Sequence, residues 1–339
     1  MIGVFEGWFG GGLPGKSPRQ EPLGELTAVE PNPHVVIIGP GSMGLTHAAL
    51  LARAGADVTV LDYRPQRAAE LSASGISIRG AAGDFAVKVP VTAVASQLRP
   101  PNLAVFFVKA YSTAAALRHA QEALQEPTIL LTLQNGLGNY ELLVEFAGAH
   151  RVVAGTTSSA AYRTGAAEVH VAAIGDIQIG GAGAAAQVAH QVCELFSSAE
   201  LPAAVCDDPQ AMLWRKAIVN AGINPLAALA GVRNGALLQV PALRLLLGGL
   251  VREAQEIARV AGIGLDENMV AVAEQVAAHT AQNRCSMLQD LRAGRRTEIE
   301  QISGHLAAVG YEHNAPAYLN QTLVSMVKAA AAMKGSRPL

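Results

Sequence analysis

A glycine-rich turn between a short apolar run and a helical pattern restricts the fold of this 339-residue chain more than any other feature. Residues 34–38 are mostly apolar and β-branched, and the sequence GPGSMG follows at residues 39–44. Residues 45–55 have the pattern of a helix that ends at a glycine, and residues 57–61 that of a second buried strand. This order predicts the first strand–turn–helix–strand unit of an α/β dinucleotide-binding fold.

The glycines of this turn have the G-x-G-x-x-G spacing. In such a turn the first glycine permits a tight bend, the second lets a pyrophosphate approach the backbone, and the third lets the helix pack on the strand. The phosphates then meet the free N–H groups and the positive end of the helix. The residues predicted to bind the cofactor here are Gly39, Gly41, Ser42, Met43 and Gly44.

Asp62 ends the second predicted strand, 18 residues beyond Gly44, and bears on the choice of cofactor. An acid at this position accepts hydrogen bonds from a ribose 2′-hydroxyl and repels a 2′-phosphate, which favours NAD. Arg64 and Arg67 lie just beyond it and could instead hold a 2′-phosphate. A third interpretation is that Asp62 only caps the turn into the next helix. We include Asp62 and Arg64 among the candidate cofactor-binding residues.

The first half of the chain contains further strand-like runs, with a helical pattern at residues 112–124. Strands that alternate with helices predict a mostly parallel, doubly wound sheet. We therefore predict an α/β, Rossmann-type domain over residues 34–206. Its further strands are expected at residues 103–108, 128–133, 152–157, 167–171 and 177–179.

The pattern becomes almost entirely helical near Asp207. Asp208 suits a helix N-cap and Pro209 the first helical position. Apolar residues then recur at helical spacing over residues 243–258. We predict that residues 207–330 form an all-helical domain that binds substrate and carries the catalytic groups.

Composition excludes several classes of protein. The formal net charge of −2 argues against a nucleic-acid or membrane-surface protein, which would need a basic face. No apolar run reaches the length of about 18 residues that a membrane span needs. The three cysteines, Cys193, Cys206 and Cys285, are too few and too scattered for a disulfide framework or a zinc site, which fits a cytoplasmic setting. The nine histidines show no metal-ligand spacing.

Residues 1–33 are rich in glycine and proline and lack the basic start and apolar core of a signal peptide. We expect a flexible N-terminal extension with no role in the fold. A docking arm is the alternative.

Lys216 is one of very few lysines in the chain, and it has amide side chains at helical spacing beside it. Asn220 lies four residues beyond Lys216, and residues four apart share a helix face. Asn224 lies four residues further and precedes Pro225, which places it at a helix end or a kink. A lysine and two amides among apolar residues are typical of the polar lining of a cleft, whereas a lone helical lysine is usually a solvated charge.

Glu298 is a candidate acid in the helical half. It follows Thr297, which fits a capping box with Glu300 for a helix that runs towards Gly310. An acid here could therefore serve only to stabilise a helix start.

Three other polar residues have both a functional and a structural interpretation. Lys109 follows the strand at residues 103–108, and ligands of such folds bind outside the carboxyl ends of strands. Asn135 follows the next strand, where a nicotinamide ring is expected, although Asn-Gly is also a common turn dipeptide. Ser286 could equally be an ordinary helix-cap serine.

These motifs, taken in order, resemble the ketopantoate reductase (2-dehydropantoate 2-reductase) family over most of the chain, about residues 34–328. The matching segments are residues 39–44 (GPGSMG), 108–111 (VKAY), 134–138 (QNGLG), 213–216 (LWRK) with Asn220 and Asn224-Pro225, and 286–290 (SMLQD) followed by 297–299 (TEI).

The resemblance implies a reductase that converts 2-dehydropantoate to D-pantoate with NADPH in pantothenate biosynthesis. It implies that Lys216 protonates the carbonyl oxygen of the substrate and that Glu298 contacts its hydroxyl. It also implies that the 2-keto acid is held by Asn220, Asn224 and Ser286, with Lys109 and Asn135 near cofactor and substrate. NADH is not excluded, because Asp62 favours it, and the chain is expected to be a monomer or a homodimer.

Two other functions are compatible with parts of this pattern. An NAD-dependent D-2-hydroxyacid dehydrogenase of the mandelate type has a similar layout, but its substrates carry no hydroxyl for Glu298 to hold. A non-catalytic sensor of the cofactor would need the glycines and not the polar residues of the helical half. The grouping of those residues therefore favours the enzyme.

Overall fold

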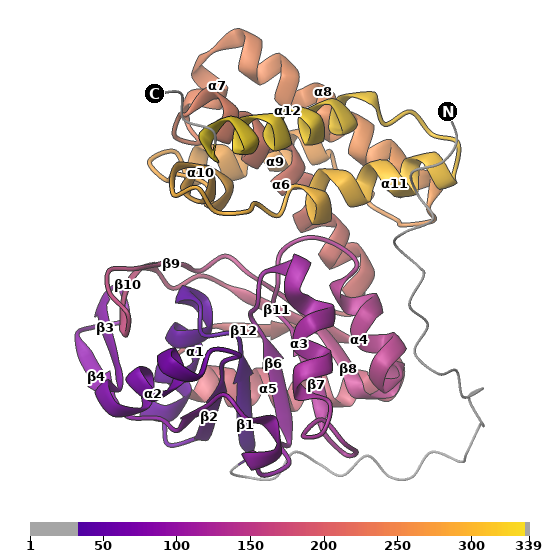
Figure 1. Cartoon of the computed structure of the whole chain (residues 1–339). Helices are drawn as coiled ribbons and strands as arrows, with labels where there is room; N and C mark the ends of the chain where they lie inside the picture. The colour runs from indigo at the N-terminus through magenta and orange to yellow at the C-terminus, as the bar shows by residue number, and fades with distance from the viewer. Residues whose placement is uncertain (1–32, 336–339) are drawn as a thin grey trace.

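The protein folds into an α/β domain and a helical domain, and α6 (Pro209–Ala230) leads from one to the other (Figure 1). This computed structural model describes residues 33–335, so nearly all of the extension predicted for residues 1–33 lies outside the described residues. The prediction of a doubly wound α/β domain followed by a helical domain is confirmed.

The α/β domain is built on an eight-stranded sheet whose central strands are buried on both faces. All five residues of β1 are buried, as expected for a strand covered by helices on both sides. The strands are parallel except at the pair β8 and β11. In spatial order they are β12 (Ala203–Val205), β11 (Ile177–Gly181), β8 (Val152–Thr157), β7 (Ile129–Thr132), β6 (Leu103–Phe106), β1 (His34–Ile38), β2 (Asp57–Leu61) and β5 (Val91–Thr92).

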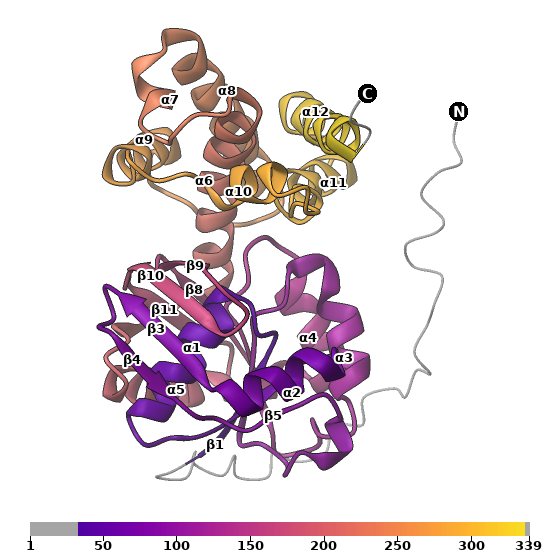
Figure 2. The ribbon, with the colours of Figure 1, turned by 60° about the vertical axis from the view of Figure 1, so that its left-hand side comes forward.

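A second sheet of four strands packs against α1 (Ser42–Arg53), as Figure 2 shows. Its order is β4 (Phe85–Val87), β3 (Ile76–Gly80), β10 (Glu168–Ala173) and β9 (Ala160–Arg163). The strand predicted at residues 167–171 therefore forms as β10 but lies outside the main sheet. A run of alternating residues does not reveal which sheet a strand joins, because that depends on distant partners.

Alternate residues of the central strand face two separate cores. Val35 and Ile37 belong to the core under α1 and α5 (Ala185–Ser198). Val36 and Ile38 face the opposite core, which includes buried residues of α3 (Thr113–Ala120) and α4 (Asn139–Ala147). The remaining helix of the α/β domain is α2 (Pro65–Ser74).

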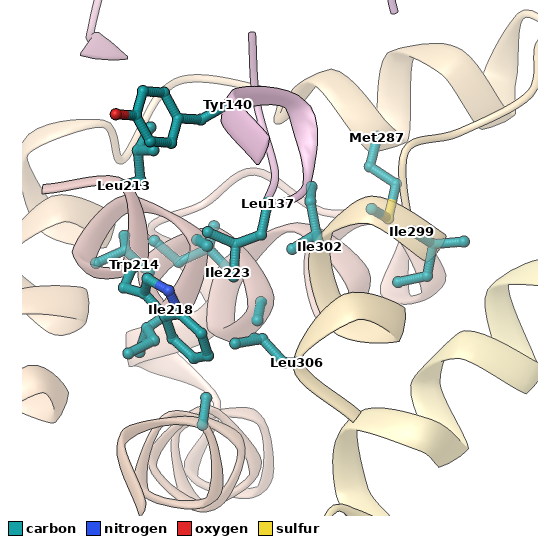
Figure 3. Packing of buried hydrophobic residues seen from close by; sticks show 14 of the residues in the cluster. Leu137, Tyr140, Leu213, Trp214, Ile218, Ile223, Met287, Ile299, Ile302 and Leu306 are labelled. Atoms are coloured by element: carbon teal, nitrogen blue, oxygen red, sulfur yellow. The ribbon is translucent and has the colours of Figure 1, made fainter. Parts of the chain in front are cut away.

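The core on the α3 and α4 side continues without a break into the helical domain. In Figure 3, Tyr140 of the α/β domain lies beside Leu213 of α6, and Leu137 lies beside Ile223 of α6. Burial of each large apolar side chain is worth roughly 1.5–3 kcal/mol. This shared core therefore holds the two domains together.

The helical domain is centred on α6, whose start matches the prediction. The Asp208 carboxylate accepts a hydrogen bond from the Ala211 N–H at 2.9 Å, and Pro209 is the first helical residue. The other helices are α7 (Ala236–Gln239), α8 (Pro241–Val260), α9 (Met269–His279), α10 (Ser286–Arg292), α11 (His305–Glu312) and α12 (Tyr318–Gly335).

Two local features differ from the predictions in this domain. Of the helix end or kink predicted at Asn224-Pro225, the helix end is absent, because α6 continues to Ala230 with buried residues on both sides of the proline. Burial of these residues outweighs the roughly 3 kcal/mol that an interior proline costs. The capping box of Thr297 and Glu300 is also absent. The chain instead enters a π-helical turn, η4 (Glu300–Gly304), and the Glu300 carboxylate pairs with Lys328 at 2.8 Å.

None of the helices within residues 33–335 is long and apolar enough to cross a membrane.

Candidate active site

The glycine turn leaves open space only where a phosphate is expected. A Cβ atom on Gly39, whose φ is +104°, would lie 2.5 Å from the Val108 backbone nitrogen. A Cβ on Gly44 would lie 2.1 Å from the Gly39 carbonyl oxygen, so both positions require glycine. At Gly41 an added Cβ would meet nothing within 4 Å. The turn and the start of α1 at Ser42 therefore fit the pyrophosphate of a dinucleotide.

Asp62 lies at the end of β2 with a fully buried side chain and two arginines beside it. Its carboxylate accepts a hydrogen bond from the Arg67 guanidinium and another from the Arg64 N–H at 3.2 Å. The Arg64 Nε lies 3.8 Å from the same carboxylate. Asp62 is thus already engaged in an ion pair, which weakens the argument for NAD that its identity alone suggested.

Lys216 projects from α6 to the α/β domain. Its Nζ donates a hydrogen bond to the Thr157 carbonyl oxygen, at the end of β8, at 3.0 Å. Burial lowers the pKa of Lys216 to about 8, and the negative charge of Glu298 partly opposes this shift. The amine therefore stays mostly protonated at neutral pH but releases its proton far more easily than an ordinary lysine, which suits proton transfer.

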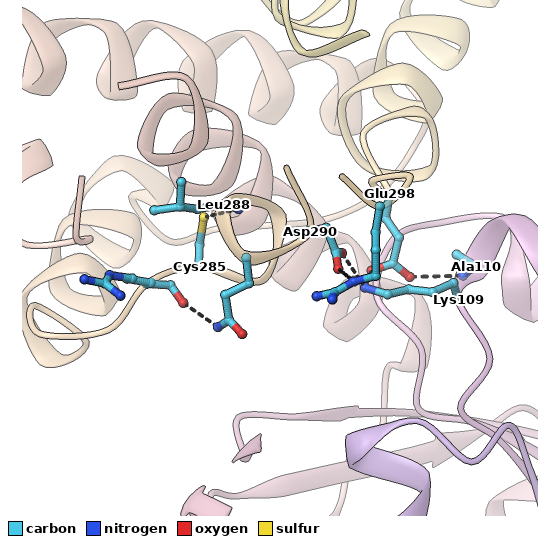
Figure 4. A network of polar contacts seen from close by, with 9 residues as sticks. Lys109, Ala110, Cys285, Leu288, Asp290 and Glu298 are labelled. Atoms are coloured by element: carbon cyan, nitrogen blue, oxygen red, sulfur yellow. Dashed lines mark hydrogen bonds and ion pairs between the residues drawn. The ribbon is translucent and has the colours of Figure 1, made fainter. Parts of the chain in front are cut away.

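Glu298 is buried and is held by two donors of the α/β domain (Figure 4). One carboxylate oxygen accepts from the Ala110 N–H at 3.0 Å, and the other from Lys109 Nζ at 3.2 Å. Lys109 Nζ also donates to the buried Asp290 carboxylate at 2.8 Å. Burial alone would lower the pKa of Lys109, but Glu298 and Asp290 outweigh it and raise that pKa, so Lys109 stays charged.

The other polar residues predicted for the site lie on three elements. Asn220 is half-buried on α6, Asn224 is buried four residues beyond it, and Ser286 is the exposed first residue of α10. Asn135 follows β7, and its carbonyl oxygen accepts from Asn139 Nδ2 at 3.1 Å. Within residues 33–335, no hydrogen bond involves the side chains of Asn220, Asn224, Ser286 or Asn135. Within the described residues, no side-chain hydrogen bond therefore links these four residues to Lys216 or Glu298.

Two models of one protein family match the chain. "Ketopantoate reductase PanE/ApbA" matches residues 35–183, and "Ketopantoate reductase PanE/ApbA C terminal" matches residues 208–331. The chain belongs to the ketopantoate reductase family. A curated 2-dehydropantoate 2-reductase of Halobacterium salinarum is 36% identical over 299 residues, which cover 87% of this chain and 98% of that relative.

Solved structures of this family and of a D-mandelate dehydrogenase have the same fold. A ketopantoate reductase from Ralstonia eutropha matches with a TM-score of 0.82 and 25% identity, covering 89% of this chain and 99% of that one. A D-mandelate dehydrogenase in complex with NADH and anilino(oxo)acetate matches with a TM-score of 0.83, 23% identity and coverage of 88% and 98%. At that identity the second match shows the fold alone.

Sequence reasoning assigned no role to three residues near this candidate site, although Asp290 and Tyr111 lie in segments that resemble the family. Thr157 contributes only its backbone carbonyl oxygen, which every residue type has, so the sequence does not indicate this contact. Asp290 lies four residues beyond Ser286, and this spacing places the two residues near one helix face. The spacing could therefore have indicated that Asp290 lies near the site. Tyr111, whose ring lies 4.4 Å under the Arg296 guanidinium, joins the two domains near Glu298.

The loop after β7 meets the helical domain through its backbone. The Leu137 N–H donates to the Gln301 carbonyl oxygen at 2.9 Å. Gly136 has a φ of +84°, and an added Cβ would lie 2.5 Å from the same oxygen. Gly136 is therefore needed for close approach of the domains as well as for the turn.

Among residues 33–335 there is no group of three or more His, Cys, Asp or Glu side chains placed to hold a metal ion.

Proposed function

We propose that this chain is a 2-dehydropantoate 2-reductase, which reduces the ketone of 2-dehydropantoate to the alcohol of pantoate with NADPH. The observation that carries this proposal is that Lys216 and Glu298 of the helical domain are each held at the domain junction by a backbone group of the α/β domain at 3.0 Å. The charge of Glu298 also acts on Lys216. The junction therefore offers a proton donor and a hydroxyl acceptor.

The residues around the glycine turn fit the dinucleotide. Gly41 would face the pyrophosphate, and Asp62, Arg64 and Arg67 would surround the adenosine ribose. When bound, the dinucleotide supplies the hydride that the carbonyl carbon of the substrate accepts. The ion pair between Arg67 and Asp62 supports NADPH over NADH, because it offsets the repulsion that a bare carboxylate would exert on a 2′-phosphate.

Lys216 is proposed as the general acid. Negative charge develops on the carbonyl oxygen during reduction, and an ammonium group beside that oxygen stabilises the charge and then gives up its proton. The Thr157 carbonyl oxygen accepts from Nζ and so fixes the amine at the junction. A pKa of about 8 keeps most of the amine protonated at neutral pH while making proton release easy. Water then restores the lost proton.

Glu298 is proposed to orient the substrate by accepting the hydrogen of its hydroxyl group. The Ala110 N–H and Lys109 hold the carboxylate in place at the domain junction. The Asn220, Asn224 and Ser286 side chains are proposed to hold the keto acid, since each has hydrogen-bonding capacity that the described protein groups leave unused. Asn135 is proposed to lie at the nicotinamide side.

An assay of cofactor oxidation tests this function. Purified protein is given 2-dehydropantoate or phenylglyoxylate, each with NADPH and with NADH, and the loss of nicotinamide absorbance is followed. We expect the highest kcat/KM with 2-dehydropantoate and NADPH. A higher kcat/KM with phenylglyoxylate would replace the proposal with a mandelate-type dehydrogenase. Cofactor binding without oxidation by either keto acid would refute both.

A further inference from the structure

The arginine side chains around Asp62 carry more positive charge than its single carboxylate can neutralise. Arg67, whose side chain is only 15% exposed, pairs with Asp62 directly, and Arg64 lies 3.8 Å away on the other side. A third guanidinium, that of Arg163, belongs to the same cluster. The positive charges of Arg67 and Arg64 and the negative charge of Asp62 all act on it. Three guanidinium groups and one carboxylate leave a net charge of +2.

Arg163 comes from outside the strand–turn–helix unit that usually defines a dinucleotide site. It is the last residue of β9, in the small sheet that packs on α1, the helix whose start forms the glycine turn (Figure 2). β9 packs against α1, and Arg163 interacts electrostatically with Asp62 at the end of β2, about 100 residues away in the sequence.

The Arg163 side chain is anchored but retains unused donors. Its Nε donates to the Gly165 carbonyl oxygen at 3.2 Å, and its Nη2 donates to the Ala166 carbonyl oxygen at 2.8 Å. A guanidinium has five N–H donors, so three remain. Among the described residues, no carboxylate lies within ion-pair distance of Arg163. Burial, Arg67 and Arg64 lower its pKa while Asp62 raises it, as expected for a cation crowded by like charges.

We propose that Arg163 is a specificity-determining residue that binds the 2′-phosphate of NADPH together with Arg64, while Arg67 neutralises Asp62. A phosphate monoester carries about −1.5 to −2 charges at pH 7, which matches the net charge of this cluster. Planar guanidinium groups are well suited to bind phosphate oxygens in pairs. The inference deepens the proposed function and rests on its choice of NADPH.

Binding of adenosine nucleotides tests this inference without any catalytic readout. Calorimetry measures the Kd of adenosine 2′,5′-bisphosphate and of adenosine 5′-monophosphate for wild type, Arg163→Ala and Arg163→Lys. Arg79→Ala is the matched control, because Arg79 lies in the same small sheet but pairs with Asp84 at 3.2 Å. Thermal unfolding of each variant confirms folding, which an exposed residue such as Arg163 should not affect.

The inference predicts that Arg163→Ala weakens binding of the bisphosphate about tenfold or more and leaves binding of the monophosphate unchanged. Arg163→Lys should recover part of the loss, and Arg79→Ala should bind both nucleotides like wild type. An unchanged Kd for the bisphosphate in Arg163→Ala, or an equal loss for both nucleotides, would overturn it. Wild type that binds both nucleotides equally would instead refute the choice of NADPH in the proposed function.

Discussion

Lys216 Nζ donates a hydrogen bond to the Thr157 carbonyl oxygen at 3.0 Å, so the proposed acid of the helical domain is positioned by the last residue of a strand in the α/β domain. Glu298 is held across the same junction by the Ala110 N–H. The two groups proposed to act on the substrate therefore reach their positions only when the domains are together. Each of the following predictions tests one part of this arrangement.

The rate of reduction should fall as the pH rises through about 8. The acid form of Lys216 is the ammonium, which dominates below its pKa of about 8 and is lost above it. The reverse reaction, oxidation of pantoate, needs the neutral amine and should rise over the same range. Measurement of kcat at saturating substrate in both directions checks this. Parallel changes with pH in the two directions would contradict the assignment.

Glu298→Gln should raise the KM for 2-dehydropantoate by about 10- to 100-fold, because the amide replaces a charged acceptor of the substrate hydroxyl. The amide still offers an oxygen to the Ala110 N–H. Kinetics with 3-methyl-2-oxobutanoate, a keto acid without the hydroxyl, provide the comparison, and its KM should barely change. Glu256→Gln is the control, since Glu256 is exposed on α8 and pairs with Arg259. An equal increase in KM for both keto acids would show that Glu298 does not bind the substrate hydroxyl.

Asp62→Asn should strengthen NADPH binding and leave NADH binding nearly unchanged, because loss of the carboxylate removes its repulsion of a 2′-phosphate and releases Arg67 from its ion pair. If Asp62 instead reads the ribose 2′-hydroxyl, the variant should lose affinity for NADH. Fluorescence titration of each reduced cofactor distinguishes the two roles of this carboxylate.

Gly136→Ala should destabilise the protein more than Gly55→Ala. Both glycines have a positive φ, +84° and +93°, so both substitutions strain the backbone by roughly 1 kcal/mol. Only at Gly136 does the new Cβ lie 2.5 Å from the Gln301 carbonyl oxygen, whereas at Gly55 it meets nothing within 4 Å. Denaturant unfolding gives the free energy of unfolding of each variant. Equal destabilisation by the two substitutions would mean that the domain junction accommodates the new Cβ without a free-energy cost.

The sequence was sufficient where a local pattern decides the structure. The strand from His34 to Ile38, the glycine turn and the helix start at Asp208 could be predicted because burial, backbone freedom and capping act within a few residues. The continuation of α6 through Pro225 was not predictable in this way, because tertiary burial of α6 outweighs the local cost of proline.

The site itself was only partly predictable for a related reason. Lys216 and Glu298 were identified by their grouping with other polar residues and by resemblance. Their partners Thr157 and Ala110 act through backbone atoms, which no residue type reveals. The pairing of Asp62 with Arg67 depends on side-chain geometry at the start of α2, so the sequence alone left the choice of cofactor open.

The most direct test of the account is the turnover of Lys216→Ala. We expect kcat for 2-dehydropantoate to fall about 10²- to 10⁴-fold, since the general acid is lost, while the Kd for NADPH stays at the wild-type value. Arg215→Ala is the control, because Arg215 adjoins Lys216 on α6 but pairs with Glu267 at the surface, and it should turn over normally. A Lys216→Ala variant with wild-type kcat would contradict the central claim.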